Sequence, residues 1–455
     1  MMDKQKLLVL TQTHNMWGGI EAWMADIFPF LEDSGWVIEY GLALGSCYNN
    51  PAQFLVHHPY MRKAHVLDGR VGTPYARQDA IRRLLKLTRP DVVMPLALGD
   101  TLPALRAERI RGLRTRLLLA VHSSHVGTLA DIIENDDIVE MVGVVSGLMK
   151  RWGDKRLEGN QVRVRWIRNG VPSPVRARTE KALSTLRMGY IGRLENGVKR
   201  AEDVPLVIAN CVGRGVPLRV EIVGDGPSRS RIINALRLIP GWDNFNYHGF
   251  QSRSVIYDAI LPEIDCLLLT SETEGSPLAV IEAMHHGVVP VVSQFHGHAA
   301  EGMLQPEKNC LVFPIGDTQC AAEQLGRLVF DSALFRRLSE SAVTTAARYT
   351  QSNMKQGWLS ALEEVSHISC RPCISRSRLA VLISGRLERW GVPPSIANLV
   401  RRFKENNLLH GSGFDEWPGS LSSGAELFAQ IRDDLAVIES ECSDELRRRL
   451  LSAPR

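Results

Sequence analysis

The chain has 455 residues, which is too long for one hydrophobic core, so two large domains with additional material are expected. Its 44% hydrophobic and 23% charged residues are typical of a globular protein. A net charge of only +4 argues against a dedicated nucleic-acid-binding protein, and no apolar stretch reaches the roughly 20 residues that a membrane span needs.

The N-terminal part alternates short apolar runs with longer amphipathic stretches. A buried strand is predicted over Lys6–Thr11, followed by a Gly18-Gly19 loop and a helix from about Ile20 to Leu31. Further strands are predicted at Asp91–Leu96, Arg116–Val121, Met141–Ser146 and Val162–Ile167. Continuous apolar strands separated by helices indicate βαβ units and a parallel sheet covered on both faces.

A linker is predicted at Pro172-Ser-Pro174 and the polar stretch after it, because proline and charge occur there without apolar periodicity. The βα alternation then restarts, with strands at Met188–Ile191, Leu218–Val223, Cys266–Leu269 and Val288–Val292. We therefore expect an α/β protein of two doubly wound, Rossmann-like domains, with a cleft at the carboxyl ends of their strands. The predicted boundaries are 1–172, 173–350, a helix at 351–366 that could cross back to the first domain, and a helical C-terminal extension at 367–455.

The extension contains a basic segment, residues 371–404, with eight Lys or Arg against Glu388. Its centre, SRLAVLISGRLERWG, could be an amphipathic helix that makes a peripheral membrane contact. The alternative, which we favour, is a solvated helix packed on the second domain.

The eight cysteines are scattered, and Cys370 and Cys373 form the one closely spaced pair. A metal site would need a second pair, and a redox motif would need a thioredoxin-like context. We therefore interpret the cysteines as reduced. The first residues lack the layout of a signal peptide, so we expect a cytoplasmic protein.

The stretch TSETEGSPLAVIEAMHHG, from Thr270 to Gly287, carries the strongest indication of chemistry. A strand ends near Thr270, Ser276 is predicted to cap a helix with Pro277 in its first turn, and Gly287 is predicted to end it. The exposed amides and positive dipole end of this helix would bind phosphate. Glu274 and Glu282, eight residues apart, could accept hydrogen bonds from hydroxyls of one ligand; alternatively they are ordinary surface glutamates.

A second element, MGYIGRLENGVKR, predicts positive charge at the mouth of the same cleft. Its strand is followed by Gly192-Arg193 and by Lys199, and such cations bind phosphate oxygens. A diphosphate leaving group needs its developing charge stabilised. Because the sequence has no Asp-x-Asp motif, we predict no metal, and Arg193, Lys199 and the helix N-terminus would do this instead.

In this order and spacing the motifs resemble those of family 4 glycosyltransferases of the GT-B fold. Glu274 and Glu282 match the Glu-x7-Glu signature of that family, and GRLENGVK matches its Gly-Arg-Leu…Lys element. VGDGP at Val223–Pro227, NGV at Asn169–Val171 and Ser146 support the resemblance, which covers roughly residues 5 to 365.

The resemblance implies roles for single positions. Arg193 and Lys199 would bind the diphosphate, Glu282 the ribose hydroxyls and Glu274 the donor sugar. The expected donor-binding set is completed by Gly19, Gly224, Gly226, Gly249, Phe250, Gly275, Ser276, Pro277 and Leu278. His122, after the strand RLLLAV, would lie near the reacting sugar and act with Glu274, Arg193 and Lys199 in catalysis.

Several alternatives stay open. His122 could instead be an ordinary strand-end histidine, and His125 competes with it. Trp17 and Glu21 flank the Gly-Gly loop and could touch the acceptor, although Trp17 could equally be a core residue. His286 is interpreted as a cation that pairs with the end of the helix dipole.

The predicted reaction is transfer of a sugar from a UDP- or GDP-sugar to an acceptor hydroxyl of a saccharide or glycolipid, without a cofactor. The resemblance implies retention at the anomeric carbon and closure of the domains over the donor. The alternatives are a nucleotide-sugar epimerase of similar fold and a catalytically silent sugar-nucleotide-binding or scaffold protein. The sequence does not name the sugar, the base or the acceptor.

Overall fold

The computed structural model describes residues 4–15, 18–174, 184–371, 373, 386–404 and 416–452. Contacts divide the chain into two units, each of which is described by itself. The first unit consists of Met1–Val144, Met149–Ile167 and Lys355–Leu435. The second consists of Val145–Leu148, Arg168–Met354 and Ala436–Arg455.

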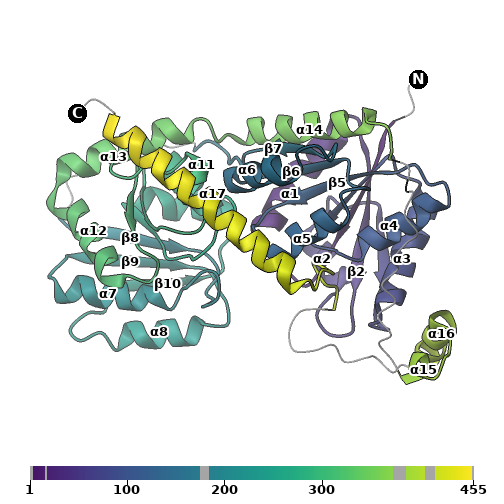
Figure 1. Ribbon diagram of the computed structural model, residues 1–455. Helices are drawn as coiled ribbons and strands as arrows, with labels where there is room; N and C mark the ends of the chain where they lie inside the picture. The colour runs from purple at the N-terminus through teal and green to yellow at the C-terminus, as the bar shows by residue number, and fades with distance from the viewer. Residues whose placement is uncertain are drawn as a thin grey trace. The chain divides into compact units, whose positions relative to one another are not determined.

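The first unit is built on a seven-stranded parallel sheet in the order β3-β2-β1-β4-β5-β6-β7 (Figure 1). Its strands are β1 (Lys6–Thr11), β2 (Val37–Leu44), β3 (Ala64–Asp68), β4 (Val92–Leu96), β5 (Arg116–Val121), β6 (Met141–Val144) and β7 (Arg163–Trp166). The chain moves outward from β1 in one direction and from β4 in the other. The carboxyl ends of β1 and β4 therefore form a topological switch point, where open α/β sheets bind ligands.

Helices alternate with these strands, and their first turns explain where several begin. The side chain of Asn50 accepts a hydrogen bond from the Gln53 amide, and Thr73 does the same for Ala76. Each cap is followed by a proline in the first helical turn. The helices that lie wholly or partly in this unit are α1 (Gly19–Asp33), α2 (Pro51–His57), α3 (Pro74–Thr88), α4 (Thr101–Ile110), α5 (Val126–Glu134), α6 (Gly147–Arg156), α14 (Gln351–His367), α15 (Arg386–Arg389), α16 (Pro394–Lys404) and α17 (Ala425–Ser452).

The second unit contains a six-stranded parallel sheet in the order β10-β9-β8-β11-β12-β13. Its strands are β8 (Leu186–Ile191), β9 (Leu218–Val223), β10 (Phe245–Gly249), β11 (Cys266–Leu269), β12 (Val289–Ser293) and β13 (Leu311–Phe313). Its helices are α7 (Asp203–Gly213), α8 (Arg229–Arg237), α9 (Arg253–Val255), η1 (Ile256–Ile260), η2 (Leu261–Glu263), α10 (Leu278–His285), α11 (His298–Glu301), α12 (Thr318–Phe330) and α13 (Ser332–Ala346). Its switch point lies between β8 and β11.

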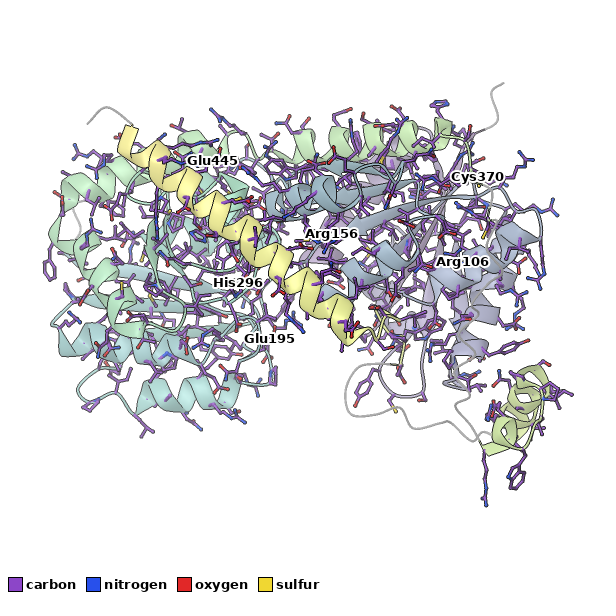
Figure 2. The ribbon with its side chains drawn as sticks, viewed as in Figure 1. Arg106, Arg156, Glu195, His296, Cys370 and Glu445 are labelled. Atoms are coloured by element: carbon purple, nitrogen blue, oxygen red, sulfur yellow. The ribbon has the colours of Figure 1, made fainter. Side chains whose placement is uncertain are left out.

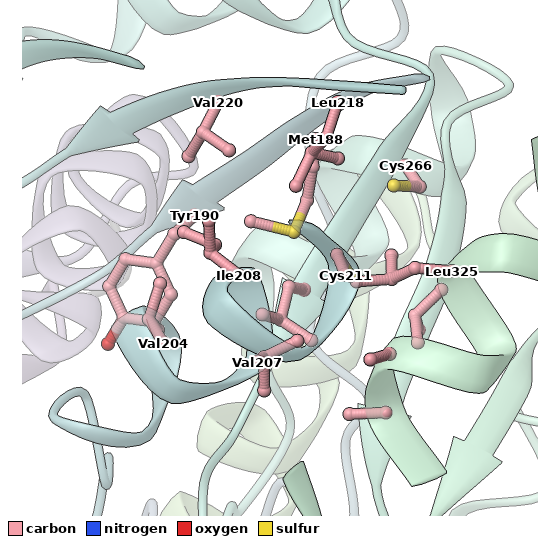
Figure 3. Packing of buried hydrophobic residues seen from close by; sticks show 14 of the residues in the cluster. Met188, Tyr190, Val204, Val207, Ile208, Cys211, Leu218, Val220, Cys266 and Leu325 are labelled. Atoms are coloured by element: carbon pink, nitrogen blue, oxygen red, sulfur yellow. The ribbon is translucent and has the colours of Figure 1, made fainter. Parts of the chain in front are cut away.

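Alternating side chains of the second sheet supply two apolar layers. Met188 and Tyr190 of β8 pack with Ile208 of α7 and Leu325 of α12 (Figure 3). Ile191 of the same strand faces the other layer, which includes α10 and α13. Because helices cover both faces of the sheet, its central strand β11 is apolar throughout. The backbone turns at the carboxyl ends of the strands are thereby held on a rigid support.

All nine strands predicted from the apolar runs are present, with ends that differ by at most two residues from the predictions. β2, β3, β10 and β13 were not predicted. β2 contains Glu39 and β10 contains His248, so neither is a continuous apolar run, and β13 has only three residues. Of the predicted linker, residues 175–183 lie outside the described residues.

The C-terminal extension contributes to both units. The centre of the basic segment, at 374–385, lies outside the described residues. The described α16 packs on α3 of the first unit, where Thr73 Oγ1 donates to Asn398 Oδ1 at 2.9 Å. The helix predicted at SRLAVLISGRLERWG, residues 377–391, lies largely outside the described residues, so its packing on the second domain stays a prediction. Among the described residues, no helix is both long enough and apolar enough to cross a membrane.

Candidate functional site

The loops after β8 and β11 meet at the switch point of the second sheet. The Lys199 ammonium lies 2.7 Å from the Glu274 carboxylate. The hydroxyl of Thr270 donates to the Lys199 carbonyl at 2.9 Å, and the Glu272 amide donates to the Val198 carbonyl at 2.8 Å. Two motifs that are 75 residues apart in sequence are therefore joined by three bonds.

Glu274 is largely buried, with 9% of its side chain exposed. Its Oε1 accepts from Lys199 and also from the Ser271 hydroxyl, at 2.5 Å. A carboxylate fixed by a cation and a hydroxyl has a defined orientation, which is what a group that selects ligand hydroxyls requires. Ser271 was not singled out in the sequence, although it directly follows Thr270 at the end of the apolar run.

Helix α10 begins at Leu278, and Pro277 occupies its N-cap position with no side-chain cap. The prediction that Ser276 caps this helix with Pro277 in its first turn is therefore wrong. The reason is local: Pro277 has extended backbone angles, and its carbonyl accepts from the Val280 and Ile281 amides. Ser276 instead accepts a hydrogen bond through its carbonyl from Asn169 Nδ2, at 3.3 Å. The predicted end holds, since the helix stops at His285 and Gly287 has a φ of +70°.

Glu282 lies inside α10 and pairs with Arg253, whose Nε is 3.1 Å from Glu282 Oε1. The guanidinium of Arg253 also lies 5.7 Å from the centre of the Tyr257 ring. Arg253 was missed in the sequence. The signal was present, because Arg253 follows shortly after β10, and the carboxyl ends of parallel strands meet at one edge.

Three glycines mark the carboxyl ends of β8, β9 and β10. The Gly192 amide donates to the Val223 carbonyl at 3.0 Å, and the Gly224 amide donates to the Gly249 carbonyl at 2.8 Å. At Gly224, with a φ of +132°, a Cβ would overlap the Gly192 carbonyl, and at Gly226 it would overlap that of Leu194. The space left by the missing side chains of Gly224 and Gly226 is thus occupied by the backbone of the Gly-Arg-Leu loop.

Arg193 lies in that loop, but its recorded ion-pair partner is Glu195, at 3.4 Å (Glu195 is labelled in Figure 2). More than half of its side chain is exposed. Phe250, after β10, is also about half exposed. Of the two predicted cations, it is Lys199 that the structure joins to the Glu274 loop.

The C-terminal helix α17 supports the loop beside Glu274. Glu439 accepts hydrogen bonds from the Gly297 amide, at 2.6 Å, and lies 3.1 Å from Nδ1 of His296, which Figure 2 labels. A Cβ at Gly297 would lie 3.9 Å from the Glu274 carbonyl. This contact was not predicted, because the last residues of the chain carry no motif.

In the first unit, His122 follows β5, as predicted, and lies among aromatic rings. Its ring centre is 4.6 Å from that of Trp23 and 6.2 Å from that of Trp358, on which it stacks. Its Nε2 is buried and has no hydrogen-bond partner among the described residues. Burial lowers the pKa of His122 to about 4, so the ring is neutral at physiological pH.

The other residues of the first unit that were considered for the site do not share the buried aromatic surroundings of His122. His125 is exposed and occupies the N-cap position of α5 without a side-chain hydrogen bond. Gly19 is the first residue of α1, with Glu21 in the same turn. Trp17 lies outside the described residues.

His286 does not have the predicted character. It is buried, and burial lowers its pKa below the usual 6.5, while its Nδ1 lies 2.9 Å from the Glu282 carbonyl. The prediction of a cation at the helix end is wrong, because burial favours the neutral imidazole and outweighs the carbonyl partner, which favours the protonated form.

The described part of the chain places no group of three or more His, Cys, Asp or Glu side chains where it could hold a metal ion. None of the eight cysteines, all of which are described, forms a disulfide, and burial raises the pKa of the Cys370 thiol.

The family match among known proteins lies within the second unit of the chain. Residues 185–331 match the family model described as Glycosyl transferases group 1. An exopolysaccharide phosphotransferase of Streptomyces coelicolor is 25% identical over 51% of this chain and 24% of its own length. A lipopolysaccharide 1,6-galactosyltransferase of Salmonella typhimurium is 27% identical over 31% of this chain and 38% of its own length. The chain thus matches well under half the length of these curated relatives.

Solved structures resemble a larger part of the chain. The lipopolysaccharide outer core galactosyltransferase WaaB, in its apo form, has a TM-score of 0.64 at 18% identity and covers 79% of this chain and 99% of its own. The Anabaena protein HepE in complex with UDP and glucose has a TM-score of 0.60 at 15% identity, covering 79% and 100%. With its two parallel sheets, the chain has the GT-B fold that was predicted.

Proposed function

We propose that the protein is a retaining family 4 glycosyltransferase that transfers a sugar from a UDP- or GDP-sugar to an acceptor hydroxyl in polysaccharide or glycolipid synthesis in the cytoplasm. The observation that carries this proposal is the Lys199–Glu274 pair at the switch point of the second sheet, 2.7 Å across. The family match at residues 185–331 includes both residues and supports it. The UDP and glucose bound by HepE favour a uridine donor.

In this proposal Lys199 binds the diphosphate together with the amides of Ser276 and Leu278 at the start of α10. Pro277 supplies no side-chain cap there, so the first-turn amides have no side-chain competitor for a phosphate oxygen. Arg193, which pairs with Glu195 at 3.4 Å, would turn toward the diphosphate when donor binds. The charge on the leaving group is then stabilised by fixed protein groups, without a metal.

Glu274 would orient the donor sugar, and Glu282, held by Arg253, would accept hydrogen bonds from the ribose hydroxyls. As the bond from the anomeric carbon to the diphosphate breaks, the acceptor oxygen forms a bond on the same face, and the leaving phosphate takes the acceptor proton. His122, neutral because its pKa is about 4, would act as a hydrogen-bonding group near the sugar and not as an acid.

The test is calorimetric titration of the full-length chain with UDP, GDP, UDP-glucose and GDP-mannose, followed by Lys199→Ala. We expect one nucleotide class to bind, and the substitution to weaken its binding tenfold or more, since a charge-assisted hydrogen bond contributes about 1.5–3 kcal/mol. Lys308→Ala is the matched control, because Lys308 is an exposed lysine of the same unit.

Products decide between the proposed reaction and its rivals. Turnover of the donor without any acceptor and with inversion of a sugar hydroxyl would indicate an epimerase. No binding of any nucleotide by the wild-type chain would refute the proposal.

A further inference from the structure

The short segment before α17 covers the carboxyl edge of the first sheet. We call residues Glu416–Ser422 the edge segment. In Figure 1 the chain just before α17 lies beside α2 and β2 of the same unit. Trp417 is 1% exposed and donates from Nε1 to the Leu44 carbonyl, at 3.2 Å, where β2 ends. The Gly99 amide, after β4, donates to the Pro418 carbonyl at 2.9 Å.

Glycines leave the room that the edge segment fills. At Gly45 a Cβ would overlap the Glu416 carboxylate, and at Gly69 it would lie 2.5 Å from the Trp417 ring. At Gly99 it would lie 3.1 Å from Ser420 backbone atoms, and at Gly127 it would lie 2.8 Å from the Ser420 hydroxyl. Real Cβ atoms essentially never approach other atoms below 3.0 Å. The loops after β2, β3 and β4 and the start of α5 are therefore shaped to this segment.

Glu416 is the centre of the hydrogen bonds in the segment. Its carboxylate accepts from the Tyr48 amide at 3.0 Å, the Asn49 amide at 2.7 Å and Asn49 Nδ2 at 3.1 Å. It also accepts from the Cys47 amide and the Ser46 hydroxyl. Burial alone would raise the pKa of Glu416, but the backbone hydrogen bonds from Asn49, Cys47 and Tyr48 hold it below its usual value.

Asn49 continues these bonds to the loop between β1 and α1. Its Oδ1 accepts from the Thr13 amide at 2.8 Å, and the Thr13 hydroxyl donates to the Ala43 carbonyl at 2.7 Å. Both Asn49 and Thr13 are buried. The amide of Asn49 can present its oxygen to Thr13 because its NH₂ is taken by Glu416.

The same loop is held on its other side by Ala97. Gln12 Nε2 donates to the Ala97 carbonyl at 2.7 Å, and Ala97 has an unusual φ of +52°. A Cβ at Gly419 of the edge segment would be in van der Waals contact with Ala97, at 3.7 and 3.8 Å. Gln12 and Thr13 thus both bond to residues that the edge segment contacts.

We propose that Glu416 is a positioning residue that fixes the β1–α1 loop through Asn49, while the edge segment closes the carboxyl edge of β2, β3 and β4. This rests on the proposed function and adds to it that Gln12–Asn15 of that loop serve the transfer. Glu416 of the C-terminal extension then influences the transfer through that loop.

The experiment compares full-length Glu416→Gln with Glu426→Gln, an exposed glutamate ten residues further on. Hydrogen exchange measured by mass spectrometry is expected to rise at Cys47–Asn49 and also at Gln12–Asn15 in E416Q, and at neither in E426Q. In E416Q the affinity for UDP is expected to stay within about twofold, because UDP is proposed to bind to the second unit. Donor turnover is expected to fall about tenfold or more, because a misplaced loop of the first unit lowers the rate of transfer.

Asn49→Ala tests whether Glu416 acts through the hydrogen bonds of Asn49 or whether its replacement merely destabilises the protein. It should raise exchange at Gln12–Asn15 and lower turnover as E416Q does, and adding E416Q to it should lower turnover little further. Faster exchange at Cys47–Asn49 with unchanged exchange at Gln12–Asn15, or additive losses of turnover, would overturn the positioning role. If the wild-type chain binds no nucleotide, the proposed function fails, while the exchange measurements still decide whether Glu416 holds the loop.

Discussion

Glu301, the last residue of α11, is a carboxyl group kept in the interior of the second unit. It is 4% exposed, and its Oε1 accepts from the Gly147 amide at 2.7 Å. Burial raises its pKa from 4.5 to about 7, although hydrogen bonds from Ser146 and Gly147 oppose the shift. Between these two pH values the folded chain holds a proton that the unfolded chain has lost.

Stability should therefore fall as the pH rises. From about pH 4.5 to 7 the free energy of unfolding is expected to decrease by an amount on the order of 3 kcal/mol from this group. Glu301→Gln cannot ionise and should lack that slope, whereas Glu340→Gln, at an exposed position of α13, should keep it. Urea unfolding at a series of pH values measures the difference; equal slopes for wild type and E301Q would contradict the assignment.

At the scale of single elements, the turns after β8 and β9 depend on each other. Gly224 has a φ of +132°, and the Gly192 carbonyl occupies the place where its Cβ would be. The β8–α7 loop, which carries Arg193 and Lys199, can therefore lie against β9 only where β9 ends in a glycine.

Gly224→Ala is expected to shift that loop. It should weaken nucleotide binding about tenfold or more and lower the melting temperature, because the backbone strain and the overlap both oppose the native turn. Gly213→Ala, in α7, meets no atom within 4 Å and should be neutral or slightly stabilising. Titration calorimetry and thermal unfolding of the two variants test this, and equal behaviour would disprove the packing argument.

The elements also show which parts of the fold a sequence can predict. β5 was predicted to the residue from its continuous apolar run LLLAV, because burial leaves little choice of side chain. β9 was also predicted to the residue, although Arg219 and Glu221 lie between its apolar residues. β10, with the pattern FNYHG, is partly exposed at the edge of its sheet, and its hydrogen bonds with β9 define it more than its composition does.

In the candidate site, too, some residues could be predicted from the sequence and others could not. That the loops of Lys199 and Glu274 meet could be predicted, because each residue lies in a short motif that follows a strand. Arg253 could have been placed at the same sheet edge, because it follows β10, but its pairing with Glu282, 29 positions away, could not be predicted. Glu416 could not be found, because its contacts are with residues such as Asn49, 367 positions away. Local patterns carry no information about such distant pairs.

At the scale of the whole molecule, each sheet has a core of its own, but the first core is assembled from distant parts of the chain. Trp358 of α14 lies 5.0 Å from Trp23 of α1, and Arg156 pairs with Asp434 of α17 (Arg156 is labelled in Figure 2). Trp417 fills the space above Gly69. Residues between Lys355 and Leu435 therefore contribute to the structure of the first unit.

Trp417→Ala should destabilise that unit by about 3–5 kcal/mol, as removal of a buried aromatic side chain does. Trp390→Ala is the control, since Trp390 is 69% exposed. Denaturant unfolding followed by circular dichroism measures both variants. A loss below about 1 kcal/mol for W417A would mean that the edge segment is not part of the folded core.

The first unit combines Met1–Val144 with Lys355–Leu435, which are far apart in the sequence. It therefore cannot complete its folding until the later residues have been synthesised. The ribosome completes the seven strands of the first sheet well before Glu416 and Trp417 are made. Until then the edge over β2 to β4 remains open, and the contacts that close it have some of the largest sequence separations in the chain, which slows folding. The second sheet, drawn almost entirely from one continuous stretch, does not share this delay, so the nascent first sheet is the part most in need of a chaperone.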